Sequence, residues 1–298
     1  MVDGSRRSCC SIPFRVVTCL LAATGWTAAP AGAIWSDDPL NNLVLADGAS
    51  EQVQPKMVAL ADGGFYVSWF DNAAGGYDVR LQRLSATGVE LWPHNGVLVA
   101  DRNLSSTTDY GLSVDTAGNA LLAFNDDSEA SERIVAAKIS PDGLAIWGTP
   151  GIAVSTSTGF LASPRIAGTD DGDVVVAWFQ VSDTVLQRLD PAGAKLWATD
   201  GLVLAHSGDT FVVADLQATG ANGGLDTGNV IVSWVRYVSF AGAKHLWAQK
   251  LDPDGLPLWG AGHKQVFDLA GGSLQFGNFP GFESDGAGGA VFAWYTSA

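Results

Sequence analysis

A repeated segment that ends in tryptophan constrains the fold of this chain more than any other feature. The segment joins a basic residue, an aliphatic residue, a turn with glycine and a Leu/Ile-Trp pair, and its glycine always stands four residues before the tryptophan. It occurs without a gap as RLSATGVELW, KISPDGLAIW, RLDPAGAKLW and KLDPDGLPLW, at residues 83–92, 138–147, 188–197 and 250–259. Four gapless copies indicate one structural unit that recurs along the chain.

A second anchor repeats with the same spacing. A strand-like run closes on an aromatic residue that follows a small one, and successive aromatic positions are 54 to 60 residues apart. The pairs are Ser68-Trp69, Ala123-Phe124, Ala177-Trp178, Ser233-Trp234 and Ala293-Trp294. A fixed period of this length with several strands per unit is typical of a propeller or another β array.

Each repeat is predicted to contain four strands, at 56–60, 65–70, 79–84 and 96–100 in the first copy. The second strands of the later copies, at 119–124, 174–179, 230–235 and 290–295, are apolar on both faces, so we expect them to be covered on both sides. Asp- and Gly-rich connections precede these strands and suit tight hairpins, with one stretched exception at 218–229.

The two ends of the repeat region are incomplete. Ile34-Trp35 followed by LVLAD at 43–47 matches Leu91-Trp92 followed by VLVAD at 97–101, so we expect 43–47 to be a fourth strand. Residues 281–298 supply only the first two strands of a fifth unit. We therefore predict an all-β, propeller-like array of four-stranded antiparallel repeats of about 55 residues, with about five blades and an incomplete last one. Closure of the ring by a three-stranded fifth blade and an imperfectly closed or fragment-like form are both open, and we favour the second.

The first 33 residues have a different pattern. Arg6 and Arg7 precede an apolar stretch at 16–26, and Ala31-Gly32-Ala33 is a small-x-small cleavage signal. This predicts a signal peptide at 1–33 and a propeller-like domain at 34–298. The alternative, a membrane anchor, is disfavoured because the apolar stretch is shorter than the roughly 20 residues that span a bilayer. We expect a secreted protein, extracellular or periplasmic, with no transmembrane segment after cleavage.

Cysteine content and charge exclude several kinds of function. Cys9, Cys10 and Cys19 all lie in the predicted signal peptide, so the mature chain has no disulfide, thiolate metal site or cysteine nucleophile. Removal of residues 1–33 leaves 13 basic and 30 acidic residues, a net charge of 13 − 30 = −17. Such a chain disfavours nucleic-acid binding and electrostatic attachment to anionic membranes.

The combination of a DG-rich turn, an aliphatic strand that ends in Trp, and Q-[RK]-[LI]-[DS]-x-x-G-x-x-[LI]-W resembles the repeats of large secreted bacterial β-propeller-like proteins, most of them without an assigned activity. The resemblance covers residues 34–298. The portion from Asp190 to Trp197 is also similar to the tryptophan-docking motif of pyrroloquinoline-quinone propellers, which implies that the tryptophans lock neighbouring blades together. The period differs and Ser85 and Ser140 replace the Asp in two copies, so cofactor binding is not carried over.

The loops that vary between repeats are the predicted binding surface. In a four-stranded meander the loops at 71–77, 126–132, 236–244 and 269–279 share one face. Variable loops held by a rigid scaffold are where binding residues concentrate. The candidate ligand-binding residues on this face are Asp71, Asn72, Asp126, Asp127 and Arg236.

No cofactor, metal site or catalytic set is predicted. Asp126-Asp127 and Asp170-Asp171 offer oxygen ligands for Ca²⁺, but neither fits a calcium-loop spacing, and turn formation is the favoured interpretation. The four histidines occupy unrelated repeat positions, and the recurrent tryptophans are better explained by blade packing than by sugar stacking. No Ser/His/Asp arrangement is evident.

The sequence therefore favours an exported, non-enzymatic module that recognises a protein or a carbohydrate through its variable loops. Two alternatives stay open. One is a propeller-type polysaccharide hydrolase or lyase in which Asp71 or Asp126 acts in acid–base roles within a central cleft. The other is a structural segment of a larger surface protein.

Overall fold

The computed structural model of this protein describes residues 35–36, 38–104, 108–128, 131–220 and 222–297. The described residues form one compact unit. The predicted signal peptide, its cleavage site and the three cysteines lie outside the described residues, so export remains a prediction. Within the described ranges, no helix is both long enough and apolar enough to cross a membrane.

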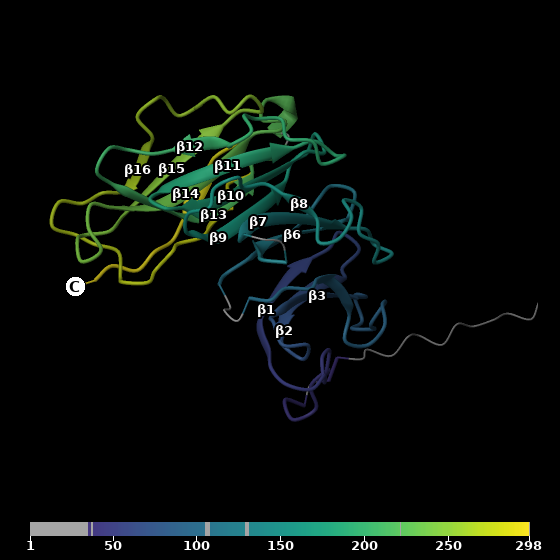
Figure 1. Cartoon of the computed structure of the whole chain (residues 1–298). Coiled ribbons are helices and arrows are strands. Elements are labelled where there is room, and N and C mark those ends of the chain that lie inside the picture. Colours follow the sequence, from purple (N-terminus) through teal and green to yellow (C-terminus); the bar gives the residue numbers. More distant parts are fainter. Residues whose placement is uncertain (1–34, 37, 105–107, 129–130, 221, 298) are drawn as a thin grey trace, which may run out of the picture. The chain divides into compact units, whose positions relative to one another are not determined.

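Four sheets of four antiparallel strands follow one another along the chain, and each is a meander of consecutive strands (Figure 1). We call them blades 1 to 4 and refer to their strands as a to d in chain order. Blade 1 contains β1 (Gln52–Ala59), β2 (Phe65–Asp71), β3 (Asp78–Leu84) and β4 (Val97–Ala100); blade 2 contains β5 (Gly111–Val114), β6 (Ala120–Asp126), β7 (Arg133–Ile139) and β8 (Ile152–Ala153); blade 3 contains β9 (Leu161–Gly168), β10 (Val174–Gln180), β11 (Asp183–Leu189) and β12 (Leu202–Leu204); blade 4 contains β13 (Thr210–Ala218), β14 (Val230–Tyr237), β15 (His245–Leu251) and β16 (Lys264–Phe267). The stretched connection in blade 4 holds a short 3₁₀ helix, η1 (Asn222–Gly224). The all-β, propeller-like class and the four-stranded repeat are thus confirmed.

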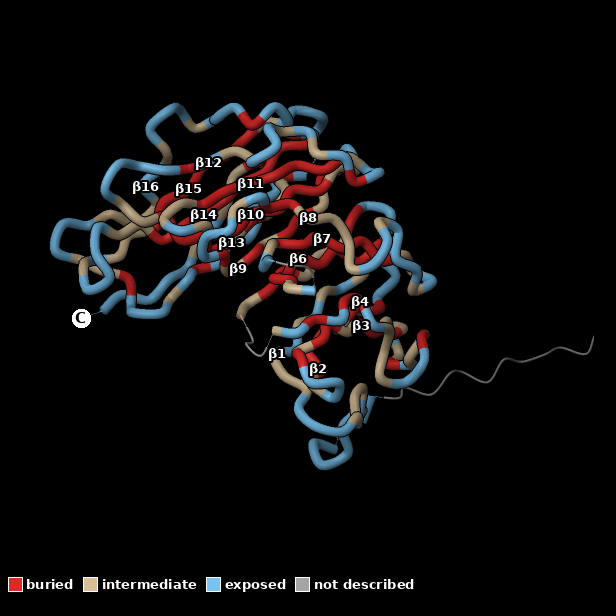
Figure 2. The backbone as a smooth tube through the Cα atoms, in the orientation of Figure 1, coloured by how far each residue is buried: buried red, intermediate tan, exposed pale blue. Residues whose placement is uncertain are grey.

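The b strands of blades 2, 3 and 4 are covered on both faces because each lies between two hydrophobic cores. In β6, Leu122 and Phe124 pack into a cluster shared with blade 1, whereas Leu121 and Ala123 pack into one shared with blade 3. All seven residues of β6 are buried, and Figure 2 shows such strands as red segments inside each blade. Successive side chains of a strand point to opposite faces of the sheet, and commonly one face meets the core and the other meets solvent. In β6 both faces meet a hydrophobic core, which explains the unbroken apolar pattern.

Tryptophan docking joins consecutive blades. The indole N–H of Trp92 in blade 1 donates to the carbonyl of Pro141 in blade 2 at 3.1 Å. The ring lies against Gly143, whose φ is +81° and whose added Cβ would stand 3.3 Å from Trp92 Cε2. Glycine is therefore needed for both the backbone conformation and the close approach. The same arrangement joins Trp35 to Ala86, Trp147 to Pro191 and Trp197 to Pro253, over Gly88, Gly193 and Gly255.

The glutamine of the repeat motif holds the tryptophan segment to its own blade. Gln187 in β11 accepts the backbone N–H of Trp197 at 3.1 Å and donates to the carbonyl of Ala198 at 2.8 Å. Gln82 and Gln249 make the corresponding contacts with the backbone around Trp92 and Trp259. The amide is fully buried in all three copies, so its hydrogen bonds are required rather than optional.

The basic residue of the motif links its own blade to the next one. Arg188 is fully buried, and its guanidinium contacts the carboxylates of Asp171 at 2.6 Å and Asp173 at 2.7 Å. It also donates to the carbonyl of Gly228 in blade 4 at 2.6 Å. Lys138 pairs in the same way with Asp115 at 2.9 Å. The aspartates of the a–b turns thus neutralise buried cations in addition to shaping the turns.

Blade 5 differs from the expectation for a covered b strand. It consists of β17 (Phe282–Ser284) and β18 (Ala290–Phe292), and β18 is shorter than the predicted strand at 290–295. Val291 is 62% exposed, although its counterparts in blades 1 to 4 are buried. The reason is that among the described residues no third strand pairs with β18, and no further sheet covers it.

The prediction of a strand at 43–47 is wrong, since the structure has no strand there. In blades 1 to 4 every d strand pairs with a c strand alone. Blade 5 has no c strand among the described residues, so residues 43–47 have no ladder to join. Trp35, which precedes this segment, nevertheless docks onto blade 1 as the tryptophan of a preceding repeat would.

We expect Trp92→Ala to lower the free energy of unfolding by about 3–5 kcal/mol, because it removes a buried indole from a blade interface. Trp35 makes the same hydrogen bond but is 44% exposed, so Trp35→Ala should cost only about 1 kcal/mol. Urea unfolding followed by circular dichroism measures both variants. Equal losses would contradict the role assigned to the buried docking contact.

Candidate functional site

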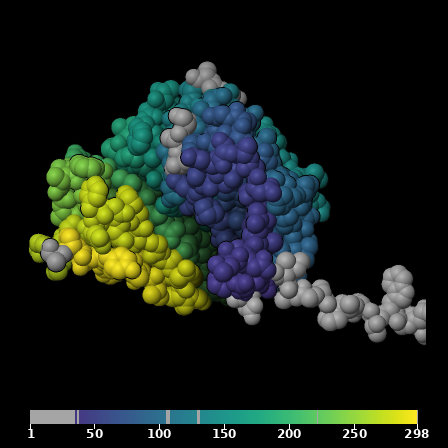
Figure 3. Space-filling view, turned by 90° about the horizontal axis from the view of Figure 1, so that it is seen from below, coloured from purple at the N-terminus to yellow at the C-terminus, as the bar shows by residue number. Residues whose placement is uncertain are grey.

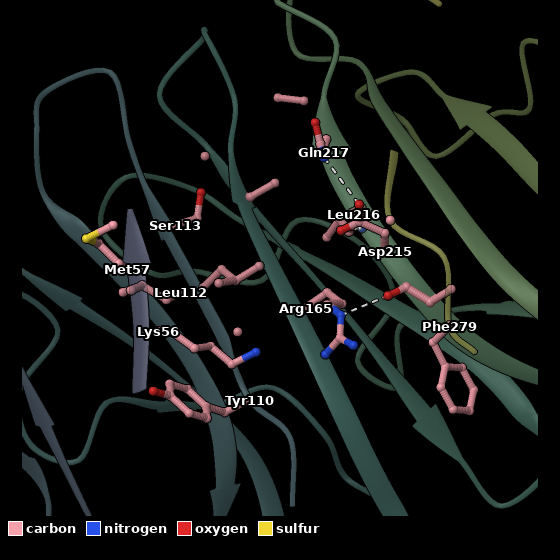
Figure 4. A pocket seen from close by; sticks show the side chains of 17 residues that line it. Lys56, Met57, Tyr110, Leu112, Ser113, Arg165, Asp215, Leu216, Gln217 and Phe279 are labelled. Atoms are coloured by element: carbon pink, nitrogen blue, oxygen red, sulfur yellow. Dashed lines mark hydrogen bonds between the residues drawn. The ribbon is translucent and has the colours of Figure 1, made fainter. Parts of the chain in front are cut away.

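A pocket of about 620 Å³ lies between the first strands of the blades (Figure 4). β1, β5, β9 and β13 form its walls, and Phe279 and Gly281, just before β17, border the remaining side. Parts of all five blades therefore surround one space. We call it the inner-strand pocket.

Three charged side chains reach the inner-strand pocket from one repeat position. In β1, β9 and β13, the charged residue pairs in register with the small residue that precedes the strand-b aromatic. These pairs are Lys56–Ser68, Arg165–Ala177 and Asp215–Ser233. Directly paired residues share a sheet face, so a small partner leaves room for the long side chain beside it.

A β-bulge precedes each of these charged residues. The register of β1 shifts between Val53 and Lys56, that of β9 shifts just before Arg165, and that of β13 shifts between Val213 and Asp215. Gln54 and Ser163 both have a φ of +51° within the bulges. Bulges bend a strand and re-aim its side chains, and they are frequent beside functional sites. Three equivalent bulges therefore direct three charged groups toward the same space.

Asp109 connects two of these groups from just behind the pocket wall. Its carboxylate lies 2.7 Å from Lys56 Nζ and 2.8 Å from Arg165 Nη2. Burial alone would raise the pKa of Asp109, but the two cations and the backbone N–H of Tyr110 outweigh burial and lower that pKa below 3.8. Asp109 is therefore ionised at neutral pH, and it holds Lys56 and Arg165 in place.

Asp215 joins blade 4 to blade 5 at the opposite wall. Its carboxylate accepts the backbone N–H groups of Leu216 at 2.8 Å and Phe282 at 3.0 Å, together with the Gln217 amide at 3.2 Å. Gln217 also donates to the carbonyl of Phe282. Across the pocket, Arg165 Nε donates to the carbonyl of Ala214 at 2.9 Å (Figure 4). The polar groups are thus fixed by neighbouring strands before any ligand enters.

Tyr110 anchors the lower part of the pocket in Figure 4. Its hydroxyl donates to the carbonyl of Gln54 at 2.9 Å, and the Ser68 hydroxyl lies 2.8 Å away. Burial is the main cause that raises the pKa of Tyr110, so the phenol stays protonated. Lys56 Nζ lies 5.0 Å from the centre of its ring, a distance at which a cation is attracted to the ring face.

The charged residues predicted from the variable loops are engaged within the protein. Asp71 and Asp126 are almost fully buried and contact Arg80 at 3.5 Å and Arg133 at 3.3 Å. Arg236 donates to Asp209 at 2.8 Å and lies over the ring of Trp247. None of the three predicted residues lines the inner-strand pocket.

The two remaining predicted residues hold loops together. Asn72 accepts the backbone N–H of Glu51 at 2.8 Å, and Asp127 accepts those of Asn103 and Leu104 at 2.8 and 3.1 Å. The structure therefore places Asp126-Asp127 beside residues 102–104, whereas Arg236 belongs to blade 4. Ligand binding by these loops stays a prediction.

Within the described residues, no group of three or more His, Cys, Asp or Glu side chains is arranged to hold a metal ion. The second pair considered for Ca²⁺ has structural contacts: Asp170 accepts the Gly228 N–H at 2.7 Å, and Asp171 pairs with Arg188. These contacts assign both carboxylates to the link between blades 3 and 4.

Sequence reasoning missed the inner-strand pocket, although a signal was present. The first strands of blades 1, 3 and 4 each contain one charged residue whose neighbours in sequence are apolar or small. These residues are Lys56, Arg165 and Asp215. Lys56 and Arg165 both stand thirteen residues before their strand-b tryptophan. Alignment of the repeats on that tryptophan would have placed both charges at one level.

Comparison with known proteins does not show a family for this chain. The chain matches no protein-family model and no curated protein sequence. Among solved structures, it is similar to an α-L-arabinanase from Penicillium chrysogenum, with 14% identity, coverage of 73% of this chain and 69% of that one, and a TM-score of 0.45. It is also similar to an endo-arabinase from Bacteroides thetaiotaomicron (12% identity, 80% and 87% coverage, TM-score 0.40) and to a protein of unknown function from Dyadobacter fermentans (11%, 73% and 65%, 0.47).

We expect Asp109 to stabilise the fold above pH 4 and to lose that effect in acid. Its folded-state pKa lies below the ordinary value of 3.8, so the contribution is complete above that value and disappears as the pH falls through the lowered pKa. The free energy of unfolding of the unchanged protein should therefore exceed that of the Asp109→Asn variant by a constant amount between about pH 5 and pH 8. Below about pH 4 the difference should shrink. A difference that already fades near pH 6 would contradict the ionised bridge.

Proposed function

We propose that this protein recognises a neutral saccharide in the inner-strand pocket. The observation that carries the proposal is the convergence of Lys56, Arg165 and Asp215 on that pocket through three equivalent bulges. This proposal keeps the binding function favoured by the sequence, but moves the site from the variable loops to the inner strands. We also propose, from the repeat motif, that this protein is related to the secreted bacterial propeller-like repeat proteins that it resembles.

The size and chemistry of the pocket support a polyhydroxylated ligand. Its volume of about 620 Å³ falls in the range of small-molecule sites, roughly 300–1,000 Å³. Arg165 has N–H donors beyond those that contact Ala214, Pro164 and Asp109, and Asp215 presents acceptor oxygens. Sugar hydroxyls both donate and accept hydrogen bonds, so they match such a mixed lining. The exposed ring of Phe279 offers an apolar surface to the C–H face of a sugar ring.

The charge balance of the site favours a neutral ligand. Lys56 and Arg165 carry two positive charges. Asp109 and Asp215 carry two negative charges, and Asp109 already pairs with both cations. A strongly anionic ligand would have to displace Asp109, and a burial cost would follow for the carboxylate left unpaired. The net charge of −15 for the whole chain also opposes the approach of anions.

Hydrolysis of a polysaccharide is a second candidate. Asp215 and Glu283 both line a neighbouring cavity of about 320 Å³, and glycoside hydrolysis commonly uses two carboxyl groups. The carboxyl groups named for this role from the sequence, Asp71 and Asp126, do not line either cavity. A pair at Asp215 and Glu283 is therefore the better hypothesis for catalysis.

Binding of neutral oligosaccharides to the purified protein, measured by calorimetry, tests the proposal. We expect Lys56→Met and Ser113→Leu to weaken binding at least about tenfold, because one removes a donor and the other fills the pocket. Asn72→Ala and Asp127→Asn are matched controls on the variable loops and should bind normally. Loss of binding in the loop variants with normal binding in the pocket variants would contradict the proposal.

The same samples test the hydrolytic candidate. Product analysis by chromatography should show no cleavage if the protein only binds. Cleavage that is lost in both Asp215→Asn and Glu283→Gln, with circular dichroism unchanged, would replace recognition by hydrolysis as the function. Cleavage that survives in both variants would exclude these two carboxyl groups from catalysis.

A further inference from the structure

A segment of the chain before the first strand lies against blade 1 without joining its sheet. Residues 38–47 contain no helix or strand, and we call them the strap. Just before the strap, Trp35 packs edge-on against Phe65 of β2, with the ring centres 6.2 Å apart. Figure 3 shows this N-terminal part of the chain, in purple, packed on one face of the molecule. Because no sheet includes the strap, side-chain contacts determine its position.

The strap and blade 1 together enclose an apolar cavity of about 350 Å³, which we call the strap cavity. Leu43 and Leu45 line it from the strap, and Val67 lines it from blade 1. Lys56 and Met57 of β1 line both the strap cavity and the inner-strand pocket. The position of the strap therefore sets the shape of a space that adjoins the pocket.

His94 joins the strap to blade 1. Its imidazole lies between two carboxylates, with Nε2 3.1 Å from Asp47 Oδ1 and Nδ1 3.0 Å from Glu90 Oε2. Asp47 belongs to the strap, whereas Glu90 belongs to the connection between β3 and β4. An imidazolium donates N–H from both nitrogens, but a neutral imidazole has only one N–H. Only the protonated ring can therefore donate to both carboxylates at once.

A second contact between the strap and blade 1 does not depend on protonation. The side chain of Asn95 accepts the backbone N–H of Asp47 at 2.9 Å and donates to the Asp47 carboxylate at 3.0 Å. An amide side chain is neutral throughout the range in which histidine titrates. Asn95 therefore fixes the place of the strap, and His94 adds a contact whose strength varies with pH.

Side chains of β3 flank these contacts. Gln82 donates to the Glu90 carboxylate at 3.3 Å. Arg80 donates to the backbone carbonyl of Asn95 at 3.4 Å and pairs with Asp71 at 3.5 Å. An amide stays neutral and a guanidinium stays charged near neutral pH. Histidine is therefore the side chain of this group whose charge changes in that range.

The carboxylates favour the protonated form of His94. The hydrogen bond to Glu90 is the largest cause that raises the pKa of His94 above 6.5, and the charge of Asp47 adds to it. Asn95 and His94 in turn lower the pKa of Asp47 below 3.8. Because the pKa of His94 is raised in the folded state, its stabilising contribution is complete below pH 6.5 and is lost as the pH rises through the raised pKa.

We propose that His94 is a pH-sensitive clasp that fastens the strap to blade 1 in mildly acidic solution and releases it in alkaline solution. Loss of the proton leaves two carboxylates beside a ring that can donate to only one of them. Asn95 alone then holds Asp47, so Leu43 and Leu45 leave the strap cavity more often. The clasp operates whether or not the inner-strand pocket holds a ligand.

Amide hydrogen exchange of the full chain without ligand tests the clasp. Each measured rate is divided by the intrinsic rate at the same pH, because the intrinsic rate itself depends on pH. Protection at residues 43–47 should fall about two- to tenfold between about pH 5.5 and pH 9, the size expected for one or two exposed ion pairs. Protection in β2 should stay constant. Equal protection of the strap at both pH values would overturn the proposal.

Variants assign the pH dependence to His94. His94→Gln and Asp47→Asn should each abolish the change in protection at residues 43–47, because neither variant can form the charged bridge. His206→Gln is the matched control: His206 is exposed and lies 2.8 Å from the carboxylate of Asp209, but it is not a neighbour of the strap in sequence or in contact. A pH dependence that persists in His94→Gln, or that disappears in His206→Gln, would overturn the proposal.

Titration of the histidine ring signals by nuclear magnetic resonance gives a second measurement, which holds even if strap exchange is too fast to follow. The signal that is absent in His94→Gln should titrate above pH 6.5 in the unchanged protein. In Asp47→Asn its pKa should be lower than in the unchanged protein, because one carboxylate has been removed. The same pKa in both proteins would contradict a bridge between the strap and blade 1.

Discussion

The contact between a tryptophan and a glycine turn is the interaction on which the rest of this protein depends. It places a large apolar ring against a backbone that has no Cβ, and it adds an indole hydrogen bond to a carbonyl of the next blade. The glycine is needed because its φ is positive and because an added Cβ would stand only 3.3 Å from the ring, as at Gly143 against Trp92. The fixed spacing of four residues between Gly and Trp follows from this single contact.

Blade order and the inner-strand pocket follow from that contact. Each docking fixes the position of one blade against the next, and buried contacts such as the hydrogen bond from Arg188 in blade 3 to the carbonyl of Gly228 in blade 4 reinforce the same interface. The a strands are thereby held around one space. Bulges before Lys56, Arg165 and Asp215 then direct charged groups into it. The motif positions that recur in the repeat units build the scaffold. Other positions of the same units, whose residues differ from blade to blade, build the pocket.

The sequence was sufficient to predict the repeat, the strand order and the blades, because these depend on local spacing and on apolar runs. It did not predict the pocket, because the approach of Asp109 to Lys56 and Arg165 depends on how three blades meet. The burial of the loop aspartates was not predicted for a related reason. Asp71 and Asp126 look like exposed loop residues, yet each is buried beside an arginine that lies in the following strand.

The predicted strand at 43–47 shows the limit of motif matching. The segment has the right residues for strand d, but a strand needs a partner, and none is provided by the described part of blade 5. The exposed β18 has the same cause. The sequence pattern therefore shows that residues 43–47 are suited to form a strand. The structure shows that a neighbouring c strand is required for that strand to form.

Amide hydrogen exchange in the presence of a bound neutral oligosaccharide tests most directly whether the inner-strand pocket is the ligand site. We expect slower exchange in β1, β9 and β13, around Lys56, Arg165 and Asp215. Exchange that slows only in the loops at 71–77 and 126–132, with the inner strands unchanged, would contradict it and return the site to the variable-loop face.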